Sequence, residues 1–161
     1  MKRYWLMKSE PSEYSITDLA RAGVGQWDGV RNYQVRNMMR DEMQPGDLAF
    51  FYHSNAGNQT GIVGEMEIVS HAYPDPTQFD QAHDQYDPNA TKDTPRWLCV
   101  DVRYQQAFTQ PLLLTTMRHD STLKDFSLLR RGNRLSILPL TAPEYQYLRQ
   151  QALQPKSMAH R

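Results

Sequence analysis

Hydrophobic positions along the chain follow two periods, and the shorter one marks the strands. Residues 3–9 alternate loosely and are rich in Tyr and Trp until Pro11 ends the run. Residues 47–54, DLAFFYHS, form an aromatic run that is typical of a buried strand and follows a Pro-Gly turn. The same pattern predicts further strands over residues 62–72, 96–108 and 134–138.

Helical spacing appears between these strands, and three helices are expected to begin at capping residues. The first N–H groups of a helix have no partner within it, and Ser, Thr or Asn side chains accept from them. An acidic residue three positions later completes a capping box. Such starts occur at Ser15, Asn32 and Thr141, with helix ends near Gly23, Pro45 and Leu153, and a further short helical segment is predicted over residues 114–129.

Strands outnumber the helices and do not alternate with them regularly. Regular alternation signals a doubly wound parallel sheet, so the pattern favours an α+β fold, a small mixed barrel with flanking helices. A chain of 161 residues suits one domain, which we expect over residues 1–154, with residues 155–161 as a flexible tail. Residues 73–95 hold four prolines and five aspartates with little periodicity, which is typical of an excursion that is either functional or floppy.

Composition excludes several classes of protein. Cys99 is the only cysteine, which excludes an internal disulfide and a Cys-rich zinc site. The mean hydropathy is -0.74, no apolar run is long enough to span a bilayer, and the first residues lack the apolar stretch of a secretion signal. We therefore expect a soluble protein with no membrane role in a reducing, cytoplasmic setting.

Charge is balanced overall but uneven along the chain. Eighteen basic residues match 18 acidic ones, which argues against binding to nucleic acid by bulk charge alone. Residues 118–134 carry five basic residues against two acidic ones, whereas residues 65–101 carry eight acidic residues against two basic ones. The first of these segments is suited to attract phosphates, although ordinary surface charge explains the same pattern.

Motifs for metal binding or for catalysis are missing from the sequence. The five histidines are scattered, and none lies three or four residues from another, so no metal site is predicted. The phosphate-loop motif GxxxxGK[ST] and the hydrolase motif GxSxG are both absent. Lys8, Ser9, Glu10, His53 and Ser54 are suitable residue types for general base or nucleophilic catalysis, but the sequence does not show that they converge.

Aromatic residues at strand ends and turns give a sharper indication of function. Rings in such places line a cavity, and stacked rings hold a flat heterocycle. We expect Trp5 and Phe50 to pack in the core. Trp27 is different, because it lies beside Gly29 and the polar start of the second helix, where free backbone N–H groups favour a ligand. We therefore expect Trp27 to form a pocket wall.

Four motifs in order resemble the EVE domain family over nearly the whole chain. They are KSEP at residues 8–11, WDGVRNYQVRN at 27–37, GDLAFFYHSN at 46–55 and PRWLCVDV at 95–102. The resemblance implies a PUA-like mixed β pseudo-barrel flanked by helices, related to the YTH readers of methylated adenine in RNA. It also implies that a modified base, notably a modified cytosine in DNA, is bound in an aromatic and polar pocket.

The family motifs assign a set of residues to this pocket. A carboxylate such as Glu10 can accept from the exocyclic amine of cytosine, and Trp27 can stack on the base. A base within a duplex must flip to enter, so contacts to flanking phosphates are needed, and arginines are the candidates. Each candidate arginine also suits a surface salt bridge, and Arg36 and Arg134 suit one equally well. The implied pocket residues are Lys8, Ser9, Glu10, Trp27, Asn32, Tyr33, His53, Ser54 and Trp97, and the phosphate candidates are Arg31, Arg36, Arg131 and Arg134.

The expected partner is a nucleic acid that carries a modified base, bound by a monomer without metal, organic cofactor or catalytic residue. The sequence does not choose between DNA and RNA. Eukaryotic relatives carry a long basic extension before the domain, so we expect a cytoplasmic location here and a nuclear one only in a eukaryote. Two alternatives stay open: an enzyme that acts on a modified nucleotide or small molecule through His53 and Glu10, and an interaction module whose pocket has decayed.

Overall fold

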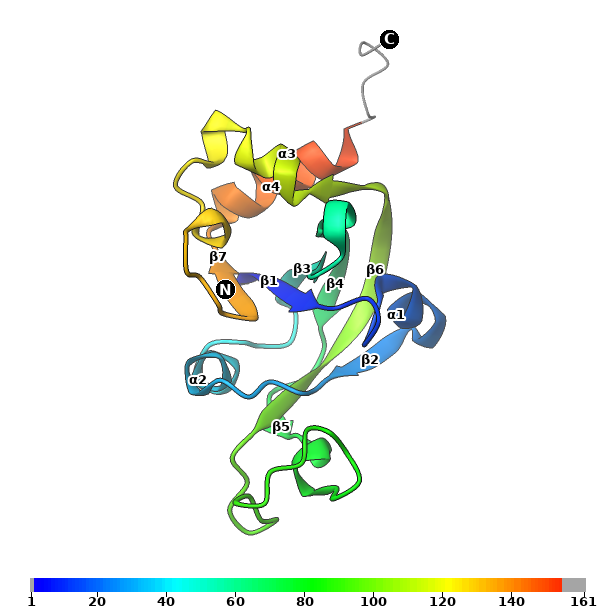
Figure 1. Ribbon diagram of the computed structural model, residues 1–161, viewed down its shortest axis with the longest axis vertical. Helices are drawn as coiled ribbons and strands as arrows, with labels where there is room; N and C mark the ends of the chain where they lie inside the picture. The colour runs from blue at the N-terminus through cyan, green and yellow to red at the C-terminus, as the bar shows by residue number, and fades with distance from the viewer. Residues whose placement is uncertain (1, 155–161) are drawn as a thin grey trace.

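A computed structural model describes residues 2–154, and one mixed sheet of seven strands organises them (Figure 1). The strands follow the order β2-β6-β4-β3-β1-β7, and β5 pairs with β6 beside this path. β1 and β3 run parallel, and the other pairs are antiparallel. Among the described residues the outer strands β2 and β7 do not pair with each other, so the barrel is open. The strands are β1 (Tyr4–Ser9), β2 (Val24–Trp27), β3 (Leu48–His53), β4 (Gly61–Ile68), β5 (Tyr73–Pro74), β6 (Leu98–Leu113) and β7 (Ile137–Leu140).

The barrel-like curvature comes from β6, which is 16 residues long and joins three neighbours. Its first six residues pair with β5 and then β2, and residues 102–113 pair with β4. The register against β4 shifts between Ile62 and Gly64, where several extra residues of β6 are accommodated. Such bulges bend a strand and increase its twist. One strand therefore turns from the small β5 and β2 pairings into the main sheet.

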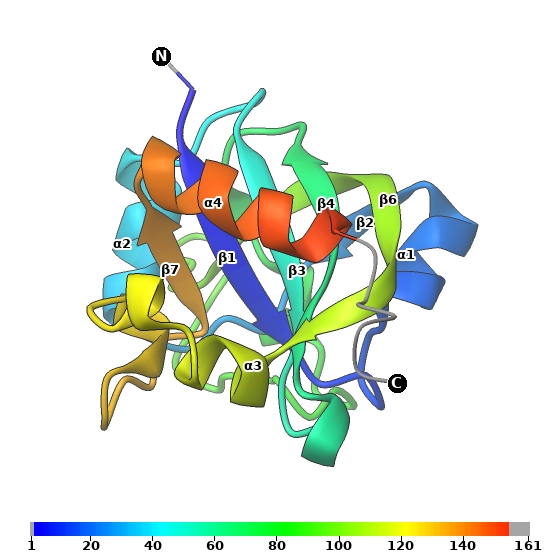
Figure 2. The same cartoon turned by 90° about the horizontal axis from the view of Figure 1, so that it is seen from above.

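Four α-helices cover the two faces of this sheet. They are α1 (Ile16–Ala22), α2 (Tyr33–Asp41), α3 (Leu114–Arg118) and α4 (Ala142–Leu153). Figure 2 shows α4 lying across the strands of the main sheet, with α3 beside it and α2 and α1 at opposite sides. The apolar residues of α1 and α2 belong to one core cluster and those of α4 to another. The sheet thus separates two hydrophobic layers.

Period-two alternation in the central strands explains this division. Trp5 and Met7 of β1 belong to the cluster of α1 and α2, whereas Leu6 between them belongs to the cluster of α4. Phe50 and Phe51 of β3 divide in the same way. The prediction that Trp5 and Phe50 pack in the core is confirmed, because both are at most 1% exposed.

The three predicted helix starts are confirmed by their hydrogen bonds. The Ser15 side chain accepts from the backbone of Asp18, whose carboxylate accepts from the Ser15 N–H. Thr141 and Glu144 form the same reciprocal pair at α4, and Asn32 accepts from the third residue of α2 at 3.0 Å. These local bonds are why the sequence specified the starts of α1, α2 and α4.

Several element boundaries differ from the sequence prediction. The four residues of β2 were not expected, because only Trp27 among them is buried and so they carry no clear alternation. The predicted helical segment 114–129 is the five-residue α3 followed by two 3₁₀ turns. β4 ends at Ile68, and β7 begins only at Ile137. The proposed tail, residues 155–161, lies outside the described residues.

Candidate functional site

A cleft of about 620 Å³ lies where β1 and β2 end. Five separate parts of the chain line it: the end of β1 with the following turn, the end of β2, the residue after β3, the segment between β5 and β6, and the approach to β7. Small-molecule sites have volumes of roughly 300 to 1,000 Å³, so the cleft is large enough for one nucleobase and its sugar. The lining residues are 8–10, 13, 14, 26–29, 54, 83–85, 134 and 136.

The structure brings together only part of the pocket predicted from the sequence. Five of its nine residues line the cleft: Lys8, Ser9, Glu10, Trp27 and Ser54. The other four, Asn32, Tyr33, His53 and Trp97, are not among the lining residues. Of the four phosphate candidates, Arg134 lies at the cleft.

Trp27 forms the aromatic wall of the cleft and is held rigidly by two neighbouring rings. Its ring meets Phe51 edge to face at 5.1 Å between centroids and meets Tyr14 in the same way at 6.5 Å. Only 5% of the residue is exposed. No unpaired side-chain N or O atom of the described residues is sealed from solvent. The Trp27 indole N–H has no hydrogen-bond partner among these residues and therefore keeps some contact with solvent.

The KSEP and HSN segments are joined by hydrogen bonds beside this wall. The Ser54 N–H donates to the Ser9 carbonyl at 3.0 Å, and the Ser9 hydroxyl donates to the Tyr14 carbonyl at 2.7 Å. The Asn55 side-chain amide donates to Glu10 Oε2 at 3.0 Å. Because these bonds use the Ser9 hydroxyl proton for the fold, the Ser9 hydroxyl can only accept hydrogen bonds from a ligand.

Carboxylates dominate the charge of the cleft. Glu10, Glu13, Asp28 and Asp84 all line it, against Lys8 and Arg134. Burial and the nearby charge of Asp75 raise the pKa of Asp28, and burial lowers the pKa of Lys8. Hydrogen-bond acceptors therefore outnumber cationic donors, and the cleft favours a ligand with N–H donors.

Tyr33 and Trp97 build an aromatic clamp outside the cleft. Their rings stack with centroids 4.7 Å apart, and the Arg36 guanidinium lies 4.7 Å from the Tyr33 centroid. The Trp97 indole N–H donates to Asp87 Oδ2 at 2.7 Å. Asn32 uses its side chain to cap α2. The helix mouth that the sequence suggested as a pocket rim therefore connects α2 to the segment before β6.

His53 supports the start of α1. Its Nε2 accepts from the Ile16 N–H at 3.1 Å, and its ring packs edge to face on Phe51 at 5.4 Å. Burial lowers the pKa of His53, so the neutral ring that this hydrogen bond needs is favoured. The Nε2 lone pair is thus engaged by the backbone and is not free to act as a general base, and Glu10 pairs with Asn55 instead. This geometry speaks against the enzyme alternative.

We expect the free energy of unfolding to fall on acidification because of His53. The unfolded chain binds the proton near pH 6.5 and the folded chain only at lower pH, so stability is complete above pH 6.5 and declines as pH falls toward the lowered pKa. The loss should be about 1 kcal/mol, the usual value of one hydrogen bond. Urea denaturation from neutral to mildly acidic pH measures it.

The matched variant for this test is His53→Gln, whose amide oxygen can accept from the same N–H without titrating. The variant should show a flatter pH dependence than the natural protein, while every other titrating group is shared by the two. The role of His53 at α1 would be refuted by identical pH profiles.

The four candidate arginines fall into two pairs. Arg31 and Arg36 point inward: Arg31 donates to Asp75, and Arg36 donates to the backbone carbonyl of Arg96 at 3.1 Å. Arg131 and Arg134 are exposed, and neither has a salt-bridge partner among the described residues. Only the second pair is therefore free to contact phosphates.

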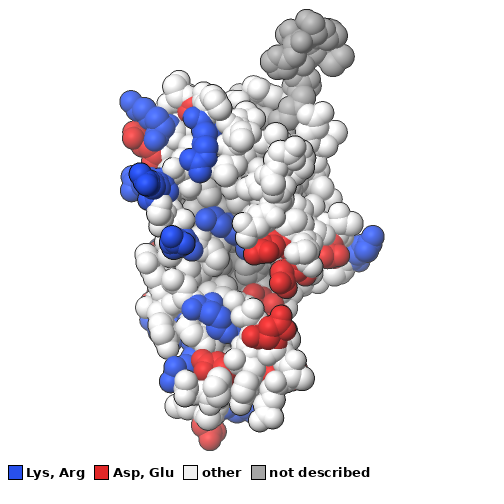
Figure 3. Space-filling view, viewed as in Figure 1, with Lys and Arg blue, Asp and Glu red and all other residues white. Residues whose placement is uncertain are grey.

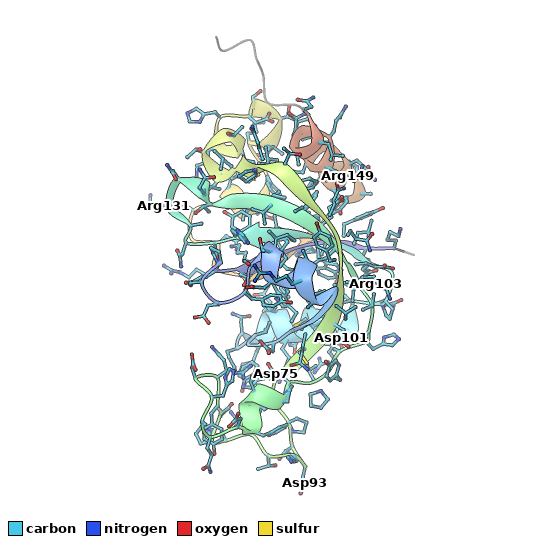
Figure 4. All side chains as sticks on the ribbon, turned by 90° about the vertical axis from the view of Figure 1, so that its right-hand side faces the viewer. Asp75, Asp93, Asp101, Arg103, Arg131 and Arg149 are labelled. Carbon is cyan, nitrogen blue, oxygen red and sulfur yellow. The ribbon has the colours of Figure 1, made fainter. Side chains whose placement is uncertain are left out.

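Arg131 and Arg134 belong to a wider group that we call the basic segment, Arg118, Lys124, Arg130, Arg131 and Arg134, all exposed. Figure 3 shows basic side chains gathered along the upper left of the view, over the part of the chain between α3 and β7, and acidic ones near the middle. Figure 4 shows Arg131 on one side of the molecule and Arg103 toward the other. Arg134 belongs to the basic segment and also lines the cleft, so the two meet at this residue.

Within the described residues there is no group of three or more His, Cys, Asp and Glu side chains that could hold a metal ion. Over the same part of the chain, every helix is too short or too polar to cross a membrane.

The model of the family described as EVE domain matches residues 3–151. The chain belongs to the EVE domain family. The resemblance seen in its four sequence motifs is thereby confirmed. Thymocyte nuclear protein 1 of Mus musculus is 43% identical over 168 residues, which cover 92% of this chain and 73% of the mouse protein.

Solved structures of related EVE domains show the same fold. A crystal structure of a Pseudomonas syringae protein matches with 43% identity and a TM-score of 0.89, and covers 93% of this chain and 99% of the other. The crystal structure of human THYN1 protein in complex with DNA that contains 5-methylcytosine matches with 39% identity and a TM-score of 0.87, and covers 96% and 99% of the two chains. The predicted α+β, PUA-like fold is confirmed, with the sheet open.

Nine of the 15 residues that line the cleft of this EVE domain were not foreseen from the sequence. Tyr14, Asp28 and Ser136 lie next to predicted elements, and the Trp-Asp-Gly triplet was a signal that could have included Asp28. His83, Asp84 and Gln85 belong to the aperiodic segment 73–95, whose length alone indicated a functional excursion. No local pattern in that segment marks which of its residues reach the cleft.

Proposed function

We propose that this EVE domain binds DNA that carries a modified cytosine and that the flipped base occupies the cleft beside Trp27. The observation that carries the proposal is the similarity to human THYN1 protein, whose crystal structure contains 5-methylcytosine DNA. The aromatic wall, the volume of about 620 Å³ and the adjoining basic segment support it. In this proposal the protein is a reader and carries out no reaction.

The base contacts follow from the groups that line the cleft. Trp27 offers a ring for stacking, worth about 1 to 3 kcal/mol per base, and its indole N–H can donate to the cytosine carbonyl. Glu10 or Asp28 accepts from the exocyclic amine. Lys8, Ser9 and Ser54 complete the polar edge. Asn32, Tyr33, His53 and Trp97 then act indirectly, by holding α1, α2 and the segment before β6.

The carboxylates give the cleft a reason to distinguish 5-methylcytosine from thymine. Both bases carry the 5-methyl group, but thymine presents a carbonyl oxygen where cytosine presents an amine. Beside Glu10 and Asp28 that carbonyl has no donor and is repelled. A missing polar partner in a buried site costs about 1 to 3 kcal/mol, which corresponds to roughly 5-fold to 150-fold in affinity.

The flipped base also requires favourable contacts outside the cleft. Extruding a base costs a few kcal/mol, and the acidic lining repels phosphates. Arg131 and Arg134, on the basic side of the cleft, are the proposed phosphate contacts. The duplex would therefore be held asymmetrically, with its backbone over the basic segment and away from Glu13 and Asp84.

Fluorescence anisotropy with matched labelled duplexes tests this proposal. One position carries 5-methylcytosine, cytosine or thymine, and a matched RNA carries 5-methylcytidine. Burying one methyl group contributes about 0.8 kcal/mol, so we expect roughly fourfold preference for 5-methylcytosine over cytosine and a larger one over thymine. Equal affinity for all duplexes would refute the reader function, and tighter binding of the RNA would move it to RNA.

The phosphate contacts have their own control within the same assay. Arg131→Gln should weaken binding to every duplex alike and reduce the slope of log affinity against log salt by about 0.9. Arg103→Gln is the matched control, because Arg103 is also exposed but lies toward the other side of the molecule (Figure 4). An equal effect of both variants would mean that binding follows net charge and not the basic segment.

A further inference from the structure

The outer wall of the cleft comes from a lobe, residues 76–97, which leaves the sheet after β5 and returns at β6. Figure 1 shows it as the green part that projects at the bottom of the molecule. It contains the 3₁₀ turn Pro76–Phe79 and supplies His83, Asp84 and Gln85 to the cleft. Before the lobe, only the two residues of β5 pair with the sheet, whereas after it the chain continues as β6. Residues 76–97 themselves belong to none of the strands. The position of the wall therefore depends on side-chain contacts.

Arg31 connects this lobe to the turn that follows β2. Its Nη2 donates to the Gln85 carbonyl at 2.6 Å and to Thr77 Oγ1 at 2.9 Å. Its Nη1 donates to Asp75 Oδ2 at 3.1 Å. One guanidinium thus holds both the beginning of the lobe, at Thr77, and Gln85, which lines the cleft. The planar fork of arginine permits these simultaneous hydrogen bonds, and the single ammonium of lysine does not.

Asp75 joins the same contacts to the main body. It is fully buried, and its Oδ2 accepts from the Gly29 N–H at 2.8 Å as well as from Arg31. Its Oδ1 accepts from the Thr77 N–H at 2.8 Å and from the Thr77 hydroxyl at 2.6 Å. Gly29 and Gln85 both line the cleft and are neighbours, because a Cβ atom at Gly29 would lie 3.8 Å from Gln85 Cδ. The carboxylate therefore ties the turn after β2 and the beginning of the lobe to one point.

We propose that Arg31 and Asp75 form a latch that holds the lobe against the turn after β2, and so act as positioning residues for base recognition. The proposal rests on the proposed function for what the cleft recognises. The basic segment has no part in the latch, so loosening the latch should leave sequence-independent DNA binding intact. The selective contacts, which need a fixed distance between the walls, should be weakened.

Asp75→Asn is the obvious variant but leaves a guanidinium without its carboxylate in a buried site, which endangers folding. A substitution at Thr77 weakens the latch more mildly, because Thr77 lies outside the cleft lining and its hydroxyl bridges Asp75 and Arg31. Thr77→Val removes the hydroxyl at nearly constant shape, and Thr77→Ser restores it. Arg31→Lys is the second variant that weakens the latch, since lysine keeps the positive charge but lacks the forked guanidinium.

Hydrogen exchange followed by mass spectrometry, together with the duplex assay, measures the effect. In Thr77→Val and Arg31→Lys we expect amides of residues 76–97 to exchange about tenfold faster, while those of α4 are unchanged. The preference for 5-methylcytosine over thymine should fall several-fold with affinity for unmodified duplex retained, and Thr77→Ser should resemble the natural protein in both measurements.

The two proposals fail in different ways. Natural protein that shows no preference among the duplexes refutes the reader function, and the exchange data then decide alone whether the latch holds the lobe. Unchanged exchange in both weakened variants overturns the latch whatever the binding result. Faster exchange with the full preference retained shows that the latch orders the lobe but does not position the base contacts, and it overturns the positioning role.

Discussion

The Trp27→Ala variant is expected to lose about 3 to 5 kcal/mol of unfolding free energy, the usual cost of truncating a buried tryptophan to alanine. Trp27 is 5% exposed and packs edge to face on Phe51 and Tyr14. The same variant should bind modified and unmodified duplexes equally, because the cleft loses the ring on which the base would stack. Urea denaturation and fluorescence anisotropy measure the two effects.

Trp27→Phe separates recognition from stability. It keeps an aromatic ring against Phe51 but removes the indole N–H that is proposed to donate to the base, so the modified duplex should bind about tenfold more weakly while the fold survives. Trp5→Phe is the matched control, since Trp5 is a core residue whose N–H donates to Asp47 at 2.9 Å. Unchanged preference in Trp27→Phe would rule out the indole N–H as a donor. An equal loss of affinity for the modified duplex in Trp5→Phe would mean that the effect comes from destabilisation of the fold.

Much of the fold is encoded in local patterns that a single sequence reveals. The capping boxes at Ser15 and Thr141 each provide acceptors for two backbone N–H groups within four residues. They can therefore be recognised without knowledge of the tertiary structure. The central strands β1 and β3 alternate between two buried layers and are therefore strongly hydrophobic. By contrast, β2 is a short strand at one end of the sheet with one buried residue, and its pairing with β6 leaves no local signal.

The candidate site was less predictable because it depends on partners that are distant in sequence. Trp27 was foreseen as a wall, and the resemblance to the EVE domain family supplied Glu10 and Ser54 to face it. Residue type alone could not reveal that the Nε2 of His53 accepts from α1, or that Arg31 reaches across more than 40 positions to Asp75. Polar side chains at the start of a helix form hydrogen bonds within the fold first, and only the donors and acceptors left over are available to a ligand.

Glu65 illustrates the same limit in the core, because its residue type gives no sign that it is buried. It lies in β4, and only 6% of its side chain is exposed. Tyr145 Oη donates to Glu65 Oε2 at 2.6 Å, Gln106 Nε2 donates to Oε1 at 2.6 Å, and Arg149 Nε donates to Oε2 at 3.0 Å. These donors come from α4 and β6, so one carboxylate fastens the covering helix to the sheet.

Glu65→Ala is accordingly expected to lower the free energy of unfolding by about 2 to 4 kcal/mol, because the buried hydroxyl of Tyr145 and the amide of Gln106 are left without an acceptor. Arg149 adds less to this loss, since 42% of its side chain is exposed and it can turn to water.

Glu67→Ala is the matched control for this prediction, two residues farther along β4. Glu67 also has an arginine partner, Arg103 at 3.4 Å, but 29% of its side chain and 55% of that of Arg103 are exposed. Screening and side-chain entropy limit such pairs to about 1 kcal/mol or less. Urea denaturation of both variants measures the difference. Equal losses would mean that burial adds nothing to the Glu65 contacts and that α4 is held to the sheet by its apolar residues alone.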